Sequence, residues 1–308
     1  MLDNLANKKI AVLMGGLSAE REVSLSSGAA VLEALRGAGY NAAPIVYDGP
    51  GLVKDIAETR HDLVFLALHG KFGEDGTIQG LLETMGLPYT GTGVTGSAIA
   101  MDKAITKKIL KYHNIPTAEC IIVKNSSADL SLAESFGLPA VVKPSTQGST
   151  IGMSFVYKKD DMSSALKLAF SHDREAVVER YIEGREITAG ILNYEALPLV
   201  EIVPKSGVYD YDAKYLTHDT EYICPAKLPP QLEKRIKAMA IEVFDVLHGY
   251  GYARVDFRVG RDENPYVLEM NTLPGMTSTS LLPKAASAAG LNFTGLIERM
   301  LEGALRRG

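Results

Sequence analysis

The first quarter of the chain alternates between short apolar runs and a stretch of helical periodicity. Lys9–Met14, Asn41–Tyr47 and Asp62–Leu68 are apolar runs of strand length. Between the first two runs, apolar residues recur at helical spacing, at Leu25, Ala29, Leu32 and Leu35, until Gly37 and Gly39 end the pattern. This alternation predicts a doubly wound parallel sheet, whose ligands lie beyond the carboxyl ends of its strands.

From about residue 101 the apolar runs become shorter. Segments of strand character are Ile121–Val123, Ala140–Lys143, Met153–Tyr157, Ala176–Tyr181 and Arg185–Leu192. Helices are predicted at Ser97–Tyr112, Ser131–Phe136, Pro229–Leu247 and Leu281–Ala289. Two runs around a polar turn, Tyr252–Val259 and Pro265–Asn271, predict a β-hairpin. The fold class is therefore α/β, and the residues expected in its cores include Val12, Leu66, Val141, Val255 and Leu268.

The predicted hairpin carries an unusual set of polar side chains. Side chains alternate along a strand, so Arg254, Asp256 and Arg258 share one face. On the return strand Glu269 and Asn271 share a face, which by the same alternation includes Val267 but neither Leu268 nor Met270. If the two faces coincide, two carboxylates and an amide oxygen converge beside an arginine.

Such a convergence of oxygen ligands favours Mg²⁺, which binds one or two carboxylates together with nucleotide phosphates. The alternative interpretation is a salt-bridged hairpin on a solvated face. The hairpin by itself does not decide between the two.

Two polar segments follow strands of the predicted parallel sheet. They are Gly15–Ser24 and His69–Gly76, and both are rich in glycine and charge. Their candidate ligand contacts are Glu20, Glu22, His69, Glu74 and Asp75. Each of these residues could equally be a loop charge or a helix cap.

Later segments add candidates for phosphate and nucleoside binding. A loop of small residues follows Lys143, and such loops let backbone N–H groups approach phosphates. Lys103 is a second candidate cation, although either lysine could be an exposed surface charge. Glu179 and Glu186 flank a turn and could hold a ribose, and Tyr209–Tyr215 is typical of a functional loop or lid.

Ser280 precedes the predicted helix at residues 281–289 and is a candidate N-cap. A helix N-terminus there would also suit a substrate carboxylate.

The sequence GTGVTG at residues 91–96 matches the dinucleotide-binding pattern GxGxxG. The strand before it is only a few residues long, and no acidic residue ends a second strand at the expected distance. We therefore interpret GTGVTG as a turn that leads into a helix. No GxxxxGK[ST] sequence occurs, which excludes a P-loop.

The composition is that of an ordinary globular protein. Its 308 residues suggest two or three domains, hydrophobic residues make up 46%, and the net charge is −5. The chain has no long basic run, which argues against nucleic acid and anionic membranes as partners. No signal sequence or membrane-spanning run is evident, and the two cysteines, Cys120 and Cys224, are not in a CxxC arrangement. We expect a cytoplasmic protein with reduced thiols.

Several motifs occur in an order that closely resembles the D-alanine–D-alanine ligases of the ATP-grasp superfamily. They are GGLSAEREVS at 15–24, HGKFGEDG at 69–76, MDK at 101–103, VKPSTQGSTIGM at 142–153, YDYDAKY at 209–215, ARVDF at 253–257 and LEMNTLPGMTSTSLLP at 268–283. The resemblance covers nearly the whole chain. It implies an N-terminal doubly wound domain at 1–96, a central ATP-grasp subdomain at 97–182 and a C-terminal subdomain at 183–308, with ATP between the last two.

The resemblance also implies roles for individual residues. ATP would be bound by Lys103, Lys143, Glu179, Arg180, Tyr181, Ile182, Glu186 and Lys214, with the loop at 145–151 closing over the phosphates. Two Mg²⁺ ions, for which Mn²⁺ can substitute, would be held by Asp256, Glu269 and Asn271. The first D-alanine would contact Glu20 and His69, and the carboxylate of the second would contact Ser280 and Leu281.

Catalysis, by the same resemblance, would involve Glu20, Ser149, Arg254, Tyr215, Gly275 and Ser280. Arg254 and the Gly275 backbone N–H would stabilise the oxyanion, while Glu20, Ser149 and Tyr215 would tie the lid to the site. The implied product is D-alanyl-D-alanine for peptidoglycan synthesis, made through a D-alanyl phosphate. The resemblance further implies a homodimer.

Two residues bear on how far the resemblance carries. Arg180 stands where the family frequently has lysine, in a stretch that contacts adenine largely through the backbone. Tyr215 favours the dipeptide, because relatives that make D-alanyl-D-lactate carry phenylalanine at the lid position.

Three other functions are alternatives to this one. A D-lactate ligase, or another carboxylate–amine ligase of this fold, is the alternative within the class. A nicotinamide-dependent oxidoreductase built on GTGVTG would leave the hairpin unexplained, and an amino-acid-binding protein would have no use for two phosphate-facing lysines.

Overall fold

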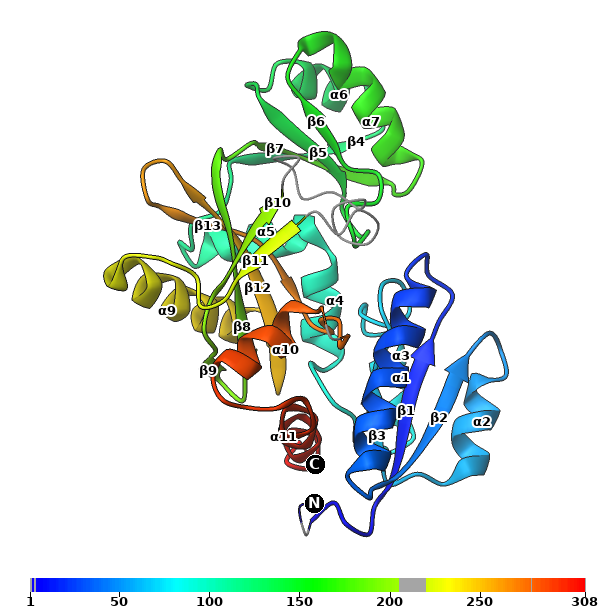
Figure 1. Cartoon of the computed structure of the whole chain (residues 1–308). Coiled ribbons are helices and arrows are strands. Elements are labelled where there is room, and N and C mark those ends of the chain that lie inside the picture. The colour runs from blue at the N-terminus through cyan, green and yellow to red at the C-terminus, as the bar shows by residue number, and fades with distance from the viewer. Residues whose placement is uncertain (1, 3, 205–219, 278, 308) are drawn as a thin grey trace.

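The computed structural model describes residues 2, 4–204, 220–277 and 279–307. The predicted lid at Tyr209–Tyr215, and with it Lys214 and Tyr215, lies outside the described residues. Three β-sheets organise the rest, as Figure 1 shows, and the described ends of the chain lie close together near the first sheet. In the described part, no helix has both the length and the apolar character that crossing a membrane requires.

The first sheet is parallel, with strand order β2-β1-β3. Its strands are β1 (Lys9–Gly15), β2 (Asn41–Tyr47) and β3 (Leu63–Leu66). The accompanying helices are α1 (Arg21–Gly37), α2 (Leu52–Thr59) and α3 (Thr77–Thr84). The prediction of a parallel sheet is confirmed, whereas the hydrophobic pattern gave no indication of α2 and α3.

The second sheet is antiparallel, with strand order β4-β7-β5-β6. Its strands are β4 (Cys120–Lys124), β5 (Ala140–Pro144), β6 (Ser154–Val156) and β7 (Glu175–Arg180). It is accompanied by α6 (Ser127–Glu134), the short 3₁₀ helix η1 (Lys159–Asp161) and α7 (Met162–Phe170). Apolar side chains of the sheet and of α7 form a separate small core.

The third sheet has strand order β11-β10-β8-β12-β13, with β9 paired to β8. Its strands are β8 (Gly184–Leu192), β9 (Glu195–Ala196), β10 (Val200–Pro204), β11 (Thr220–Ile223), β12 (Tyr252–Gly260) and β13 (Pro265–Asn271). The helices that follow or separate these strands are α9 (Pro230–Val246), α10 (Leu281–Ala288) and α11 (Phe293–Leu305). The hairpin predicted from the sequence is β12–β13.

The hydrophobic cores do not follow the chain order strictly. Leu110 of α5 (Lys103–Tyr112) belongs to the core of the third sheet. In contrast, Leu296 and Leu301 of α11 pack into the core of the first sheet. The domain limits at 96 and 182 therefore stay predictions, although one sheet falls in each predicted range.

The predicted single helix at 97–112 is in fact two helices, α4 (Val94–Met101) and α5, and the prediction of one helix was wrong. The break lies at Asp102, whose backbone is extended and whose Oδ1 accepts a 3.1 Å hydrogen bond from the N–H of Ile105. Ser145 also donates to this carboxylate, at 2.7 Å. The cap stabilises a new helix start and turns Lys103 toward the loop after β5.

Four of the five predicted core residues are buried, Val12, Leu66, Val141 and Val255. Leu268 is only half-buried, so that prediction was wrong. The register shifts between Asp256 and Phe257, since Asp256 pairs with Glu269 but Phe257 pairs with Val267. Leu268 is the extra residue of this β-bulge, and the bulge turns it toward a cavity instead of the core.

Candidate functional site

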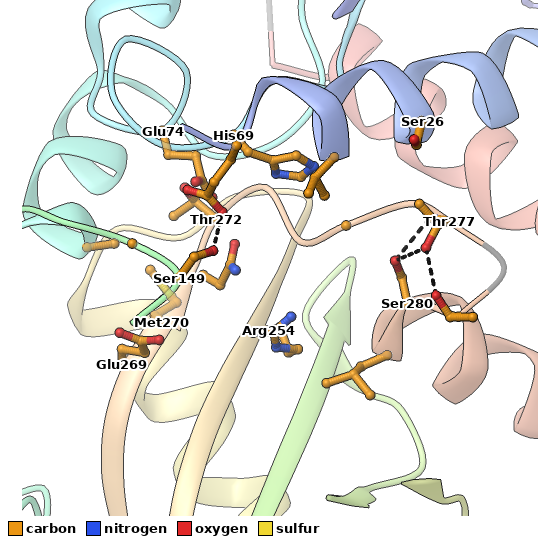
Figure 2. A pocket seen from close by; sticks show the side chains of 18 of the residues that line it. Ser26, His69, Glu74, Ser149, Arg254, Glu269, Met270, Thr272, Thr277 and Ser280 are labelled. Atoms are coloured by element: carbon orange, nitrogen blue, oxygen red, sulfur yellow. Dashed lines mark hydrogen bonds between the residues drawn. The ribbon is translucent and has the colours of Figure 1, made fainter. Parts of the chain in front are cut away.

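Two adjoining pockets lie where the three sheets meet. The larger, of about 790 Å³, is lined by loops of the first sheet, by the end of β13 and by the start of α10 (Figure 2). The smaller lies between the second sheet and the third. Lys103, Gly148, Ser149 and Glu269 line both pockets, so a ligand in one would be next to a ligand in the other. Every described residue that the family resemblance gave a role lines one of them. Asp75, a candidate from its polar segment alone, lines neither pocket and instead accepts hydrogen bonds from the N–H groups of Phe72 and Thr77.

The β12–β13 hairpin brings the predicted polar side chains together. Asp256 lies opposite Glu269, and Arg254 lies opposite Asn271, so the two polar faces coincide. The bulge at Leu268 turns Val267 away from this face. Val267 is instead fully buried in the core. The expectation for Val267 was therefore wrong, because strict alternation ends at a bulge.

Within this group Asp256 is held in a fixed orientation. Arg254 donates from Nε and Nη2 to the two oxygens of Asp256, each at 2.8 Å, and Thr188 donates to Oδ1 at 2.6 Å. In contrast, Oδ1 of Asn271 is buried and has no hydrogen-bond partner among the residues that the structure describes. Buried polar atoms normally have partners, so an orphaned amide oxygen beside two carboxylates fits a divalent cation with oxygen ligands.

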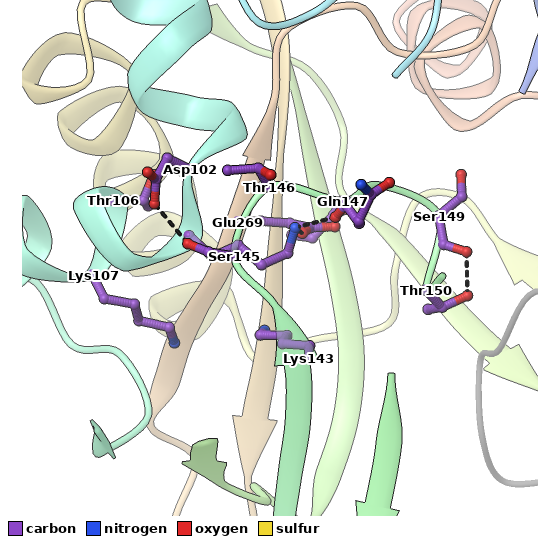
Figure 3. A network of polar contacts seen from close by, with 12 residues as sticks. Asp102, Thr106, Lys107, Lys143, Ser145, Thr146, Gln147, Ser149, Thr150 and Glu269 are labelled. Carbon is purple, nitrogen blue, oxygen red and sulfur yellow. Dashed lines mark hydrogen bonds and ion pairs between the residues drawn. The ribbon is translucent and has the colours of Figure 1, made fainter. Parts of the chain in front are cut away.

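A buried ion cluster lies on the opposite wall of the smaller pocket. Glu179 of β7 accepts from Nζ of Lys143 at 2.7 Å and lies 2.6 Å from Nζ of Lys107. Figure 3 shows the two lysines extending from α5 and β5 toward the same point. Burial alone would raise the pKa of Glu179, but the charges of Lys107 and Lys143 outweigh burial and lower it to about 2.

Lys107 was missed by the sequence analysis. A signal was present, because Lys107 lies four residues after Lys103 and so shares a helix face with it. Lys107 is 1% exposed, and it also donates to Oγ1 of Thr117 at 2.6 Å. A lysine buried to this degree needs a carboxylate partner, which the chain supplies from a distant strand.

Lys103 connects the loop after β5 to the metal-binding candidates. Its ammonium donates to the carbonyl of Gln147 at 2.6 Å and lies 3.5 Å from Oε2 of Glu269. The backbone of Lys103 is fixed by a 2.9 Å hydrogen bond to the carbonyl of Ser145. Of the two predicted lysines, Lys103 lines both pockets and Lys143 lines the smaller one.

The loop that joins β5 to β6 in the second sheet also contacts the segment that follows β1 of the first sheet. Ser149 donates a short hydrogen bond to Oε1 of Glu20, which precedes α1. Ser149 and Thr150 both have positive φ, at 48° and 61°. This conformation costs free energy in non-glycine residues and is common at ligand-binding sites. Gly148 approaches the same carboxylate, since a Cβ there would lie 3.1 Å from Oε2 of Glu20.

Glu20, His69 and Glu74 are titratable groups that line the larger pocket. Figure 2 shows His69 and Glu74 at the same end of it. His69 is buried and lies 3.3 Å from Oγ of Ser27, and burial lowers its pKa. Glu74 accepts a 2.6 Å hydrogen bond from the N–H of Gly70. Desolvation and the negative charge of Glu20 raise the pKa of Glu74 to about 8.

Glu74 should therefore make stability fall with rising pH. Its pKa in the folded state, about 8, is above the ordinary value of 4.5, so its favourable contribution is complete below pH 4.5 and is lost as the pH rises through 8. Glu74→Gln removes this titration. We expect the melting temperature of the parent to fall by roughly 5 °C more than that of the variant between pH 6 and 9. If the melting temperatures of parent and variant change equally between pH 6 and 9, the pKa of Glu74 is not raised in the folded protein.

The connection from β7 to β8 closes the smaller pocket. Arg180 is nearly half exposed and lies 3.5 Å from the carboxylate of Glu119. Tyr181 packs edge-to-face on Phe155, with ring centroids 5.7 Å apart. Ile182 and Glu186 complete this wall. An aromatic and aliphatic surface beside a carboxylate suits a nucleoside.

The start of α10 forms the far side of the larger pocket. Ser280 occupies the N-cap position, as predicted, but its side chain makes no cap hydrogen bond. Its Oγ accepts instead from the N–H of Thr277, at 3.0 Å, which folds the loop back on itself. Gly275 needs its small size here, because a Cβ would lie 2.8 Å from Oγ of Ser280. Leu281 is buried beside them.

The chain is similar to known ligases over nearly its whole length. Residues 109–302 match the family model "D-ala D-ala ligase C-terminus", and residues 51–92 match "D-ala D-ala ligase N-terminus". The chain is 51% identical to a D-alanine–D-alanine ligase of Pelotomaculum thermopropionicum, covering 96% of both chains. It is 48% identical to one of Syntrophotalea carbinolica, covering 98% of both.

Solved structures agree with these relatives. A D-alanine–D-alanine ligase of Bacillus anthracis superposes with a TM-score of 0.86 at 40% identity, covering 97% of this chain and 98% of the other. A structure of the enzyme from the same organism complexed with ATP gives a TM-score of 0.85 at 38% identity, with the same coverage. The predicted ATP-grasp fold is thereby confirmed.

Proposed function

The chain belongs to the D-alanine–D-alanine ligase family, and from this premise we propose that it uses ATP to join two molecules of D-alanine into D-alanyl-D-alanine for peptidoglycan synthesis. The products are then ADP, phosphate and the dipeptide. One observation carries the proposal. A pocket lined by buried lysines adjoins a second pocket whose polar groups suit an amino acid, and Lys103 and Glu269 line both.

ATP fits the smaller pocket with its phosphates toward the junction. The proposed base contacts are Glu179, Arg180, Tyr181 and Ile182, with Glu186 at the ribose and Lys103, Lys143 and Lys214 at the phosphates. The placement of Lys103 and Lys143 in this pocket, with Lys103 at the junction, supports this orientation, because both lysines would neutralise phosphate charge. The strained loop at Ser149 would cover the phosphates.

Asp256, Glu269 and Asn271 would hold Mg²⁺, and the orphaned Asn271 oxygen supports this assignment. When bound, Mg²⁺ neutralises charge on the transferred phosphoryl group. Because Asp256 is already held by Arg254, the carboxylate is oriented before any cation binds.

The larger pocket would bind both amino acids. Glu20 is suited to the ammonium group of the first D-alanine, with His69 nearby. Ser280 and Leu281 are suited to the carboxylate of the second. Arg254 and the N–H of Gly275 both line the pocket, where they would stabilise the oxyanion of the tetrahedral intermediate.

The chemistry follows from these placements. A carboxylate is a poor acyl donor, so the first D-alanine is activated by transfer of the γ-phosphoryl group of ATP to its carboxylate. The amine of the second D-alanine then attacks the acyl phosphate, and phosphate leaves. The residues must chiefly position the substrates and exclude water, which would hydrolyse the acyl phosphate. Tyr215, with Glu20 and Ser149, would hold a lid over the site.

The test is release of phosphate from ATP in the presence of Mg²⁺ and D-alanine, with L-alanine and a D-alanine/D-lactate mixture run alongside. We expect phosphate and dipeptide in equal amounts, and with the D isomer alone. Activity that requires D-lactate would mean that the product is D-alanyl-D-lactate and not the dipeptide. Absence of phosphate release in every mixture would contradict a ligase that uses D-alanine.

The family resemblance also supports a homodimer in the cytoplasm. Sedimentation equilibrium would test the dimer, and cell fractionation would test the location.

A further inference from the structure

Arg258 occupies a position on the nucleotide wall that the roles described above leave unexplained. It lies on β12 directly opposite Glu186 of β8, and both residues line the smaller pocket. Nη1 of Arg258 donates to Oε2 of Glu186 at 3.2 Å. The two side chains are only 13% and 15% exposed, so their ion pair is partly screened from water.

The same guanidinium also reaches the connection between the second and third sheets. Nε donates to the carbonyl of Ile182 at 3.1 Å, and Nη2 donates to the hydroxyl of Tyr181, also at 3.1 Å. The guanidinium carbon lies 5.5 Å from the centre of the Tyr181 ring. One side chain of the third sheet therefore holds the segment that leaves the second sheet.

We propose that Arg258 is a positioning residue for the nucleoside of ATP. It orients the Glu186 carboxylate toward the ribose and fixes Tyr181 and Ile182 as the surface for the base. The inference rests on the proposed function for the identity of the nucleotide. It assigns to Arg258 a part in selecting a ribonucleotide.

The geometry requires an arginine. Its three nitrogens each donate to a different acceptor, and the planar guanidinium fixes the angles between those bonds. A lysine ammonium could pair with Glu186, but it could not hold Ile182 and Tyr181 in the same plane. Without the guanidinium, Glu186 loses the 3.2 Å hydrogen bond from Nη1 and is oriented less firmly, so a hydroxyl of the ribose loses a well-placed charged acceptor.

The experiment compares Arg258→Met and Arg258→Lys with the parent, using ATP and 2′-deoxy-ATP. Loss of one hydrogen bond to a charged group predicts a KM for ATP about ten-fold higher in Arg258→Met. The preference for ATP over 2′-deoxy-ATP, measured as the ratio of kcat/KM values, should fall at least about three-fold. The KM for D-alanine should stay unchanged, and Arg258→Lys should recover less than half of the ATP preference.

Arg261→Met is the matched control, since Arg261 is on the same hairpin and pairs with Glu183 at the exposed surface. It should behave as the parent with both nucleotides. An unchanged ATP preference in Arg258→Met would overturn the proposal. Equal losses of kcat/KM for ATP, 2′-deoxy-ATP and D-alanine, together with a lower melting temperature, would also overturn it. Absence of turnover in the parent would count against the proposed function alone. The role of Arg258 would then be tested by calorimetry, which compares the binding of ATP and 2′-deoxy-ATP to the parent and to Arg258→Met.

Discussion

Asp256→Asn should leave the fold intact and reduce phosphate release by about 10²–10³-fold. The substitution removes one of the two carboxylates of the proposed Mg²⁺ site while keeping the shape of the side chain. An asparagine oxygen can still accept from Thr188, as Asp256 does at 2.6 Å. The variant loses one charged hydrogen bond from Arg254, which costs roughly 1.5–3 kcal/mol of stability.

The measurements are turnover as a function of Mg²⁺ concentration and the melting temperature. If Asp256 binds the metal, the variant should need more Mg²⁺ for half-maximal activity while its melting temperature falls by only a few degrees. Asp262→Asn is the control, because Asp262 lies in the exposed turn of the same hairpin. Losses of activity and of melting temperature in proportion would instead assign Asp256 to the fold.

The hairpin shows how much of the site could be predicted from local sequence. Side chains alternate along β12 and β13, which was enough to place Asp256, Glu269 and Asn271 on one face. The error at Val267 has the same origin, since a bulge depends on the partner strand and leaves no mark in the sequence of one strand alone.

Contacts between distant segments were beyond such reasoning. The partner of Lys107 is 72 residues away, and no local pattern specifies that a lysine on α5 meets Glu179 on β7. The break at Asp102 likewise depends on Ser145, which reaches the helix only after the second sheet has formed. The family resemblance supplied roles for many residues, but it left both Lys107 and Arg258 without one.

The last prediction separates the two lysines that share Glu179. Lys143 and Lys107 lie at nearly equal distances from its carboxylate, 2.7 and 2.6 Å, but Lys143 lines the nucleotide pocket and Lys107 does not. Replacing either by methionine should therefore cost similar stability, roughly 2–4 kcal/mol, because either change leaves Glu179 with one partner. Lys143→Met should also reduce kcat/KM for ATP at least about 100-fold, whereas Lys107→Met should reduce it less than about ten-fold.

Both lysine variants should be compared with the parent by melting temperature between pH 7 and 3. The pKa of Glu179 is lowered from 4.5 to about 2, so the stability it provides is present above pH 4.5 and is lost as the pH falls toward 2. The difference between parent and variants should therefore shrink on acidification, and a difference that is constant with pH would mean that ionised Glu179 is not its source. Equal effects on ATP turnover would show that the cluster acts as one unit, since the lysine outside the pocket would then matter as much as the one inside it.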